Sequence, residues 1–170
     1  MYQTFYGFAE KPFSMTPDPQ FFFPSDDHAE AMEHLLYGLM EGEGFLLLCG
    51  AVGTGKTTLS RALVERLGGQ IVPALILNPF QDFRQLLLGM LWDFGVIPEE
   101  DGGEGALLVQ LQDFLLTQIG PRGQTALVVI DEAQNLPLEV LERLRVISNL
   151  ETDKEKLLQI LLLGQEELLV

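Results

Sequence analysis

Residues 50–57 of this chain, GAVGTGKT, form a glycine-rich segment that satisfies the pattern G-x-x-x-x-G-K-[ST]. An apolar run from Phe45 to Cys49 precedes the segment, and a stretch with helical spacing from about Lys56 to Leu67 follows it. The apolar run is typical of a strand covered on both faces. Strand, glycine-rich turn and helix in this order are the context in which the pattern binds phosphate. The sequence therefore predicts an α/β fold built around a phosphate-binding loop.

The glycines of this loop allow backbone N–H groups to point inward around an anion, and the following helix adds the positive end of its dipole. We expect Lys56 to reach the β- and γ-phosphates of a nucleotide and the Thr57 hydroxyl to coordinate Mg²⁺. A structural glycine-rich turn with a surface lysine is the alternative. The predicted phosphate-binding residues are Gly50, Val52, Gly53, Thr54, Gly55, Lys56, Thr57 and Thr58.

A second apolar stretch, Thr125 to Ile130, ends in the adjacent carboxylates Asp131 and Glu132. Because ligands of parallel α/β sheets sit at the carboxyl ends of strands, we expect Asp131 to act with Thr57 on the metal, either directly or through a water. Glu132 is expected to orient or deprotonate the attacking water, and with Lys56 it forms the predicted catalytic pair. Taken alone, a strand that ends in Asp-Glu is also typical of a solvated turn.

Polar residues at two further strand ends have two interpretations each. Asn78 either caps a helix that starts at Pro79, or it hydrogen-bonds Glu132 and restrains that base until a partner binds. Gln165 follows the apolar run Leu157 to Leu163, and it either senses the γ-phosphate with its amide or is a polar turn residue. Both are candidate nucleotide-binding residues.

Gly, Pro and Asn divide the chain into alternating strand-like and helix-like blocks, which predicts a mainly parallel sheet with helices on both faces. The expected strands are 45–49, 71–77, 126–130 and 157–163, and the expected helices are about 26–40, 56–67, 79–94, 106–119 and 137–149. We interpret residues 1–36 as an N-terminal arm and first helix packed on the core, and residues 37–170 as the core. Because the sequence stops one turn into a further helix, we expect the fold to be incomplete at its C-terminus.

Composition limits the partners that this chain can bind. It has 10 Lys and Arg against 25 Asp and Glu, a net charge of −15, so generic nucleic-acid binding is not expected and an anion needs a local pocket. No apolar run approaches the ~20 residues that span a bilayer, and the N-terminus lacks the pattern of a secretory signal. The expected location is the cytosol.

Several reactive or aromatic side chains are expected to be structural. His28 and His34 lack partners at metal-ligand spacing, and Trp92 is expected in the core. Cys49, the single cysteine, is expected to fill the core. The arginines of the helix after Asp131-Glu132, at 143 and 145, are expected to be solvated, with a finger that reaches a neighbouring subunit as the alternative.

With these motifs placed, the chain resembles the ATPase domain of the general secretion pathway protein A family, the ExeA/GspA-type AAA proteins. The resemblance covers nearly every residue, and the arm and the Asn-Leu-Glu-Thr stretch are more specific to this family than the phosphate-binding loop. The chain departs from the family at Gly164-Gln165-Glu166-Glu167, where members commonly have Gly-Gln-Pro-Glu. The segments that carry the resemblance are Pro12-Phe13 with Thr16-Pro17-Asp18-Pro19, Gly53 to Thr58, Asp131 to Leu136, Ser148 to Thr152 and Leu158 to Gln165.

The resemblance implies a P-loop NTPase of the AAA type, a three-layer α/β/α fold with strand order 5-1-4-3-2. It places the fifth strand, the arginine finger and the lid beyond this chain, so the fragment alone is expected to hydrolyse ATP slowly or not at all. It implies ATP and Mg²⁺ as cofactors, a homo-oligomer in the intact protein, and hydrolysis coupled to assembly of a type II secretion (secretin) or pilus apparatus. The membrane is then reached only through other segments, with the intact protein at the cytoplasmic face of the inner membrane.

Other functions remain open at this stage. A DNA-transposition or phage-type helper ATPase has similar motifs but binds DNA as a filament, which the net charge of −15 disfavours. A non-hydrolysing, nucleotide-gated scaffold would retain ATP without releasing phosphate. A small-molecule kinase is disfavoured, because the Asp-Glu pair suggests activation of water.

Overall fold

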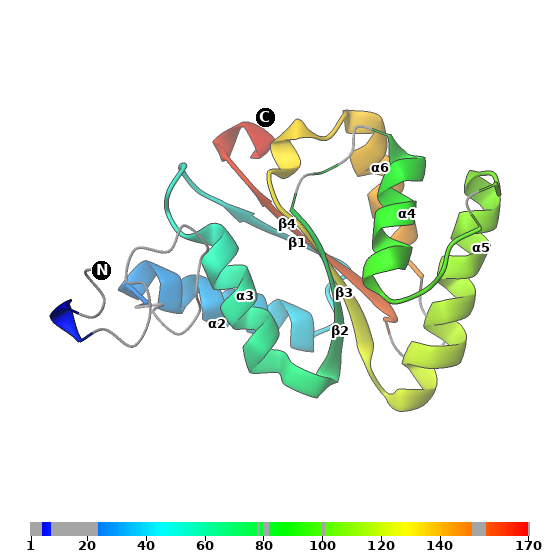
Figure 1. Cartoon of the computed structure of the whole chain (residues 1–170). Helices are drawn as coiled ribbons and strands as arrows, with labels where there is room; N and C mark the ends of the chain where they lie inside the picture. Colours follow the sequence, from blue (N-terminus) through cyan, green and yellow to red (C-terminus); the bar gives the residue numbers. More distant parts are fainter. Residues whose placement is uncertain are drawn as a thin grey trace.

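Four parallel strands form one sheet in the part of the chain that the structure describes (Figure 1). The computed structural model describes residues 5–7, 24–77, 79, 82–99, 101–150 and 156–169. The strands are β1 (Phe45–Cys49), β2 (Ile71–Ile76), β3 (Thr125–Ile130) and β4 (Leu158–Gly164), in the order β1-β4-β3-β2. Every neighbouring pair is parallel. The predicted α/β fold is confirmed, and the order agrees with the one that the resemblance implies for these strands.

Five helices of ten residues or more flank the sheet within the described residues, and Figure 1 shows them on both of its faces. They are α2 (Asp26–Met40), α3 (Lys56–Leu67), α4 (Phe83–Asp93), α5 (Glu104–Phe114) and α6 (Leu138–Ile147). A π-helical turn, Leu115–Ile119, continues α5. None of the described helices is both long and apolar enough to cross a membrane.

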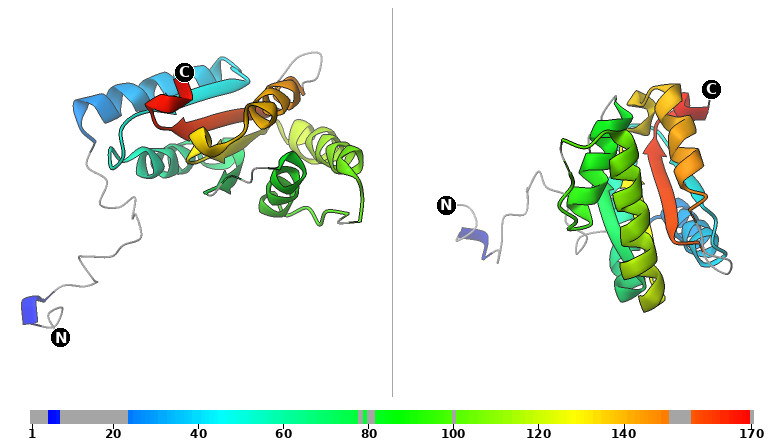
Figure 2. Two further views of the ribbon diagram at one scale, coloured as in Figure 1. Left: turned by 90° about the horizontal axis from the view of Figure 1, so that it is seen from above. Right: turned by 90° about the vertical axis from the view of Figure 1, so that its right-hand side faces the viewer.

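Alternate side chains of the strands supply two cores, one on each face of the sheet. Leu127 and Leu161 pack on the face covered by α2 and α3, beside the fully buried Leu63. Val128 and Ile160 face the other way and join the core beneath α4, α5 and α6. Figure 2 shows α4 and α5 lying side by side on this second face. Burial on both faces explains why the strand segments are continuous apolar runs.

Helix α2 begins at Asp26, as expected, and Ser25 caps it through a reciprocal capping box with His28. Helix α4 begins at Phe83 instead of Pro79, because the Asp82 carboxylate accepts hydrogen bonds from the first-turn amides. The expectation that Asn78 caps a helix starting at Pro79 was therefore wrong.

One further expectation was wrong. Trp92 lies on the outer face of α4 with 51% of its surface exposed, since the neighbouring Leu91 takes the buried position of that turn. The segment after β4 is helical, as expected, and forms a 3-10 helix, Glu166–Leu169. The expected N-terminal arm lies largely outside the described residues.

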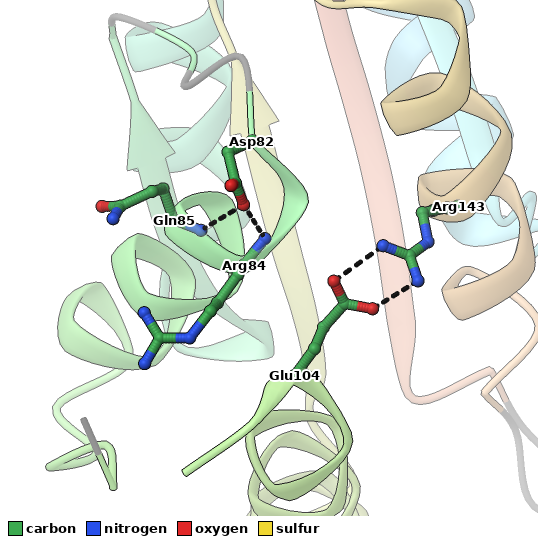
Figure 3. A network of polar contacts seen from close by, with 5 residues as sticks. All are labelled: Asp82, Arg84, Gln85, Glu104 and Arg143. Carbon is green, nitrogen blue, oxygen red and sulfur yellow. Dashed lines mark hydrogen bonds and ion pairs between the residues drawn. The ribbon is translucent and has the colours of Figure 1, made fainter. Parts of the chain in front are cut away.

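Figure 3 shows Arg143 of α6 paired with Glu104 of α5. Its guanidinium forms a bidentate ion pair with Glu104 at the start of α5 and lies 4.6 Å from the ring centroid of Phe83 on α4. The hydrogen bond to Glu104 raises the pKa of the Arg143 side chain. Arg145 pairs with Glu142 on its own helix. Both arginines therefore pair with carboxylates of this chain: Arg143 with a neighbouring helix, and Arg145 with its own helix.

Candidate functional site

The glycine-rich loop connects β1 to α3 at the carboxyl edge of the sheet, where β3 and β4 also end. Gly53 and Gly55 adopt left-handed backbone conformations, with φ of 81° and 84°, which glycine tolerates at little cost. Gly55 is the N-cap of α3 and contributes no side-chain acceptor to the first turn of that helix. No side chain therefore caps the first amides of α3. Uncapped amides are what an anion-binding helix terminus requires.

The Lys56 ammonium lies against the loop that precedes it. Its Nζ donates hydrogen bonds to the carbonyl oxygens of Gly50 (2.7 Å) and Ala51 (2.9 Å), and the Thr54 hydroxyl also donates to Ala51 (2.9 Å). The amide of Gly50 donates to the carbonyl of Gly164, so the start of the loop is tied to the end of β4. Backbone carbonyls of the loop therefore hold the Lys56 ammonium.

Thr57 and Asp131, which are 74 residues apart in the chain, meet through a short hydrogen bond from the Thr57 hydroxyl to Oδ2 of Asp131. Asp131 is buried, its amide donates to the carbonyl of Ile76, and its Oδ1 accepts from the amide of Glu132. Two hard oxygen donors in contact, one of them a carboxylate, are the ligand types that Mg²⁺ prefers. The two predicted metal ligands thus lie together and fit that ion.

Glu132 follows Asp131 in a left-handed conformation, with φ of 53° and ψ of 38°, and it is the single non-glycine residue with positive φ among those described. Such a conformation costs a residue with a Cβ about 1–2 kcal/mol. The exposed carboxylate accepts a hydrogen bond of 2.6 Å from Nε2 of Gln134. The turn therefore presents Glu132 to solvent while holding one of its oxygens.

Gln134 is a site residue that the sequence did not predict. Its Nε2 contacts Glu132, and its Oε1 accepts a hydrogen bond of 3.1 Å from the backbone amide of Gln165. One amide side chain therefore joins the segment after β3 to the segment after β4. The sequence does place Gln134 shortly after Asp131-Glu132. Polar residues are common in exposed turns, so this position alone did not indicate a role.

Most of the predicted nucleotide-binding residues lie around this loop. Val52 is at the exposed tip, with 79% of its surface accessible, and Thr58 is half-buried in the first turn of α3. The backbone amide of Gln165 donates to Gln134, and both interpretations of the Gln165 side chain stay predictions. Asn78 lies outside the described residues. Because α4 begins at Phe83 with Asp82 as its N-cap, the capping role expected of Asn78 at Pro79 was wrong, and its contact with Glu132 stays a prediction.

A cavity of about 390 Å³ opens beside the loop. Ser25, Asp27, His28 and Ala31 of the α2 end form one wall, and the loop with Leu48, Cys49 and Leu59 forms the other. Burial raises the pKa of the Cys49 thiol, although the Lys56 ammonium acts in the opposite direction. The cavity thus joins the phosphate-binding loop to the beginning of α2.

Comparison with protein families decides the assignment of this fold and loop. Residues 39–169, which include all four strands and the loop, match the family model described as an AAA domain. The chain belongs to the AAA domain family. At the level of that family it is an ATPase-type, nucleotide-binding domain, and its AAA fold is the one that the resemblance implied.

The resemblance to the general secretion pathway protein A family is also confirmed. The AAA domain is 46% identical over 168 residues to general secretion pathway protein A of Aeromonas hydrophila. The alignment covers 99% of this chain but 30% of that protein, so the chain spans under a third of its relative's length.

Solved structures agree on the fold at low sequence identity. Cdc6p of Pyrobaculum aerophilum has a TM-score of 0.68 at 18% identity, covering 93% of this AAA domain and 42% of that chain. The ORC2 protein of Aeropyrum pernix, solved as ADPNP-ADP complexes, has a TM-score of 0.59 at 20% identity, covering 86% of this domain and 43% of that chain.

Proposed function

We propose that this AAA domain binds Mg-ATP and that the protein containing it uses ATP hydrolysis to drive assembly of a type II secretion (secretin) or pilus apparatus. The observation that carries the proposal is the meeting of three elements at one sheet edge. Lys56 lies within the loop, Thr57 is hydrogen-bonded to Asp131, and Glu132 follows on the adjoining turn.

Nucleotide binding would use contacts that the loop already makes within itself. The Lys56 ammonium would exchange the carbonyls of Gly50 and Ala51 for β- and γ-phosphate oxygens. The amides of residues 53–58 would donate to the same phosphates, aided by the positive end of α3. Local donors of this kind hold an anion even on a chain with a net charge of −15.

Thr57 and Asp131 are the residues that would hold Mg²⁺ when nucleotide is present. When bound, the ion would supply charge neutralisation for the β- and γ-phosphates. The Thr57 oxygen would offer a lone pair to the ion while its hydroxyl hydrogen stays hydrogen-bonded to Oδ2 of Asp131, and the Glu132 amide would keep the orientation of that carboxylate.

Glu132 is the proposed general base. Its carboxylate is exposed to solvent, so water has access, and the hydrogen bond from Gln134 restricts its position. Oε1 is the oxygen that would accept the proton of the attacking water, because Oε2 is held by the Gln134 amide. Gln165 is proposed to sense the γ-phosphate, and Asn78 is proposed to restrain Glu132.

The assembly role is supported by the 46% identity to general secretion pathway protein A. On this proposal the intact protein is a homo-oligomer at the cytoplasmic face of the inner membrane and acts on a secretion or pilus assembly protein. A helper ATPase for DNA transposition or phage functions is the second candidate, which the net charge of −15 disfavours. A nucleotide-gated scaffold that does not hydrolyse ATP is the third.

The test combines binding and assembly. Lys56→Ala should abolish ATP binding in a calorimetric titration, whereas Arg66→Ala, at the exposed end of the same helix, should bind as the parent does. In cells that carry the intact protein, Lys56→Ala should also stop secretin multimers from forming. A Lys56→Ala chain that binds ATP normally would remove the basis of the proposal. Normal secretin assembly together with an ATP-dependent gel shift of DNA would instead favour the second candidate.

A further inference from the structure

We propose that His28, in the first turn of α2, is a positioning residue that sets the shape of the phosphate-binding loop and thereby its affinity for nucleotide. The inference rests on the proposed function, because it takes the loop to be the nucleotide site. It assigns a role to a histidine that the sequence indicated only as structural or exposed.

The contact between His28 and the loop is direct. Nε2 of His28 lies 2.7 Å from the carbonyl oxygen of Thr54, a residue 26 positions further along the chain. A Cβ built on Gly55 would lie 3.2 Å from the same nitrogen, so the ring also packs against the backbone of the next residue. Packing of α2 and α3 in one core, with Leu35 and Leu63 both buried, fixes the helix that carries the ring.

The partners of the ring define its protonation pattern. The Thr54 carbonyl can only accept, so Nε2 carries the hydrogen. Nδ1 accepts from the backbone amide of Ser25 at 3.3 Å and lies 2.9 Å from the Ser25 hydroxyl. The neutral tautomer with hydrogen on Nε2 therefore satisfies every one of these contacts, and the capping box and the loop contact use opposite ends of one ring.

This contact fixes the orientation of a single peptide group. A peptide is planar and trans, so its C=O and N–H point in opposite directions. Holding the Thr54 carbonyl toward α2 directs the Gly55 amide away from α2. In a stretch where Gly53 and Gly55 both have positive φ, the backbone has few steric barriers to rotating that peptide. His28 thus selects one of the orientations of the Thr54–Gly55 peptide that the glycines permit, and it keeps the Gly55 amide available for an anion.

Two substitutions at this position separate the hydrogen bond from the packing. His28→Phe keeps a ring but removes both nitrogens, and we expect it to weaken binding of ADP, measured by titration calorimetry, about five- to tenfold. His28→Gln retains an N–H donor and an acceptor at the capping position, and we expect a change of less than about twofold. His34→Phe is the matched control, because it makes the same change at an exposed position of the same helix.

Hydrogen exchange supplies a readout that a purely structural role would not give. In the nucleotide-free full chain, His28→Phe should raise deuterium uptake in the loop, residues 51–57, and leave residues 35–40 at the other end of α2 unchanged. We expect His28→Gln to restore both the ADP affinity and the hydrogen-exchange protection of residues 51–57 that His28→Phe loses. Thermal unfolding of each variant checks that the chain is folded. If His28→Phe is unfolded, ADP binding and hydrogen exchange of His28→Gln decide instead.

The outcomes distinguish this inference from the proposed function. If Lys56→Ala loses ADP binding while His28→Phe binds as the parent does, the positioning role is overturned and the nucleotide site stands. Loss of binding in His28→Gln, equal to that in His28→Phe, would likewise overturn the role of the Nε2 donor. If Lys56→Ala binds ADP as tightly as the parent, the nucleotide site itself is wrong.

Discussion

The loop after β1 and the turn after β3 both contain left-handed backbone, but they use it differently. In the loop the left-handed positions are Gly53 and Gly55, and in the turn the position is Glu132. Glycine allows close approach of the main chain to an anion, whereas at residue 132 a side chain is kept despite a conformational cost of about 1–2 kcal/mol. The first region is built to offer backbone groups, and the second to present a carboxylate.

The largest expected effect concerns the carboxylate itself. On the proposed mechanism, Glu132→Gln should retain ATP binding but lower the turnover of the intact protein by a factor of about 10² or more, because the base is lost. Phosphate release and calorimetric binding, measured together, check this. Unchanged phosphate release would remove Glu132 from the chemistry and leave the turn with a structural role.

Gly55→Ala should weaken nucleotide binding about tenfold or more, because it combines a positive φ with a Cβ that lies 3.2 Å from the His28 ring. Gly53→Ala is the matched variant, since its φ is similar but its Cβ would meet nothing within 4 Å. Its effect should therefore be smaller. Equal losses in the two titrations would show that φ alone, and not the contact with His28, sets the cost.

Glu132→Gly should stabilise the domain by about 0.5–1 kcal/mol while abolishing turnover, because glycine relieves the left-handed strain. Denaturant unfolding at equilibrium measures the change. Asn135→Gly, in the same turn but without a positive φ, should instead lower stability by a few tenths of a kcal/mol to about 1 kcal/mol. If both glycines destabilise equally, residue 132 stores no strain.

The smallest expected effect lies far from both regions. Arg143→Met should lower stability slightly and leave nucleotide binding unchanged, because the ion pair with Glu104 is partly exposed. Arg145→Met, whose pairing with Glu142 is more exposed, should have no measurable effect on unfolding. A loss of nucleotide binding in the Arg143 variant would contradict its assignment as a tie between helices.

Local patterns predicted the strands and the phosphate-binding loop well. The boundaries of β2 were expected at 71–77 and lie at Ile71–Ile76, since a buried apolar run leaves little choice. The pairing of Thr57 with Asp131 was also predicted, because parallel strands end at one edge of the sheet. The order of the strands came from the family resemblance and not from the pattern.

The residues that were missed act through contacts between distant segments. His28 meets the loop across 26 residues, and Gln134 contacts an amide 31 residues away, so neither contact leaves a periodic signal. The wrong start of α4 has a local cause, because Asn78-Pro79 and Asp82 both fit a helix start in the sequence, and the Asp82 carboxylate caps the first turn. Trp92 was misplaced because helical spacing alone does not say which edge of an apolar stripe faces solvent.

The amide of Gln134 has a direction. Rotated by 180°, it would set its NH₂ group against the Gln165 amide and its oxygen against the Glu132 carboxylate, so both contacts would become repulsive together. One orientation of the Gln134 amide therefore serves both bonds. The backbone after β4, by donating to Oε1, thus selects the orientation in which the same side chain can donate to the acid at the end of β3.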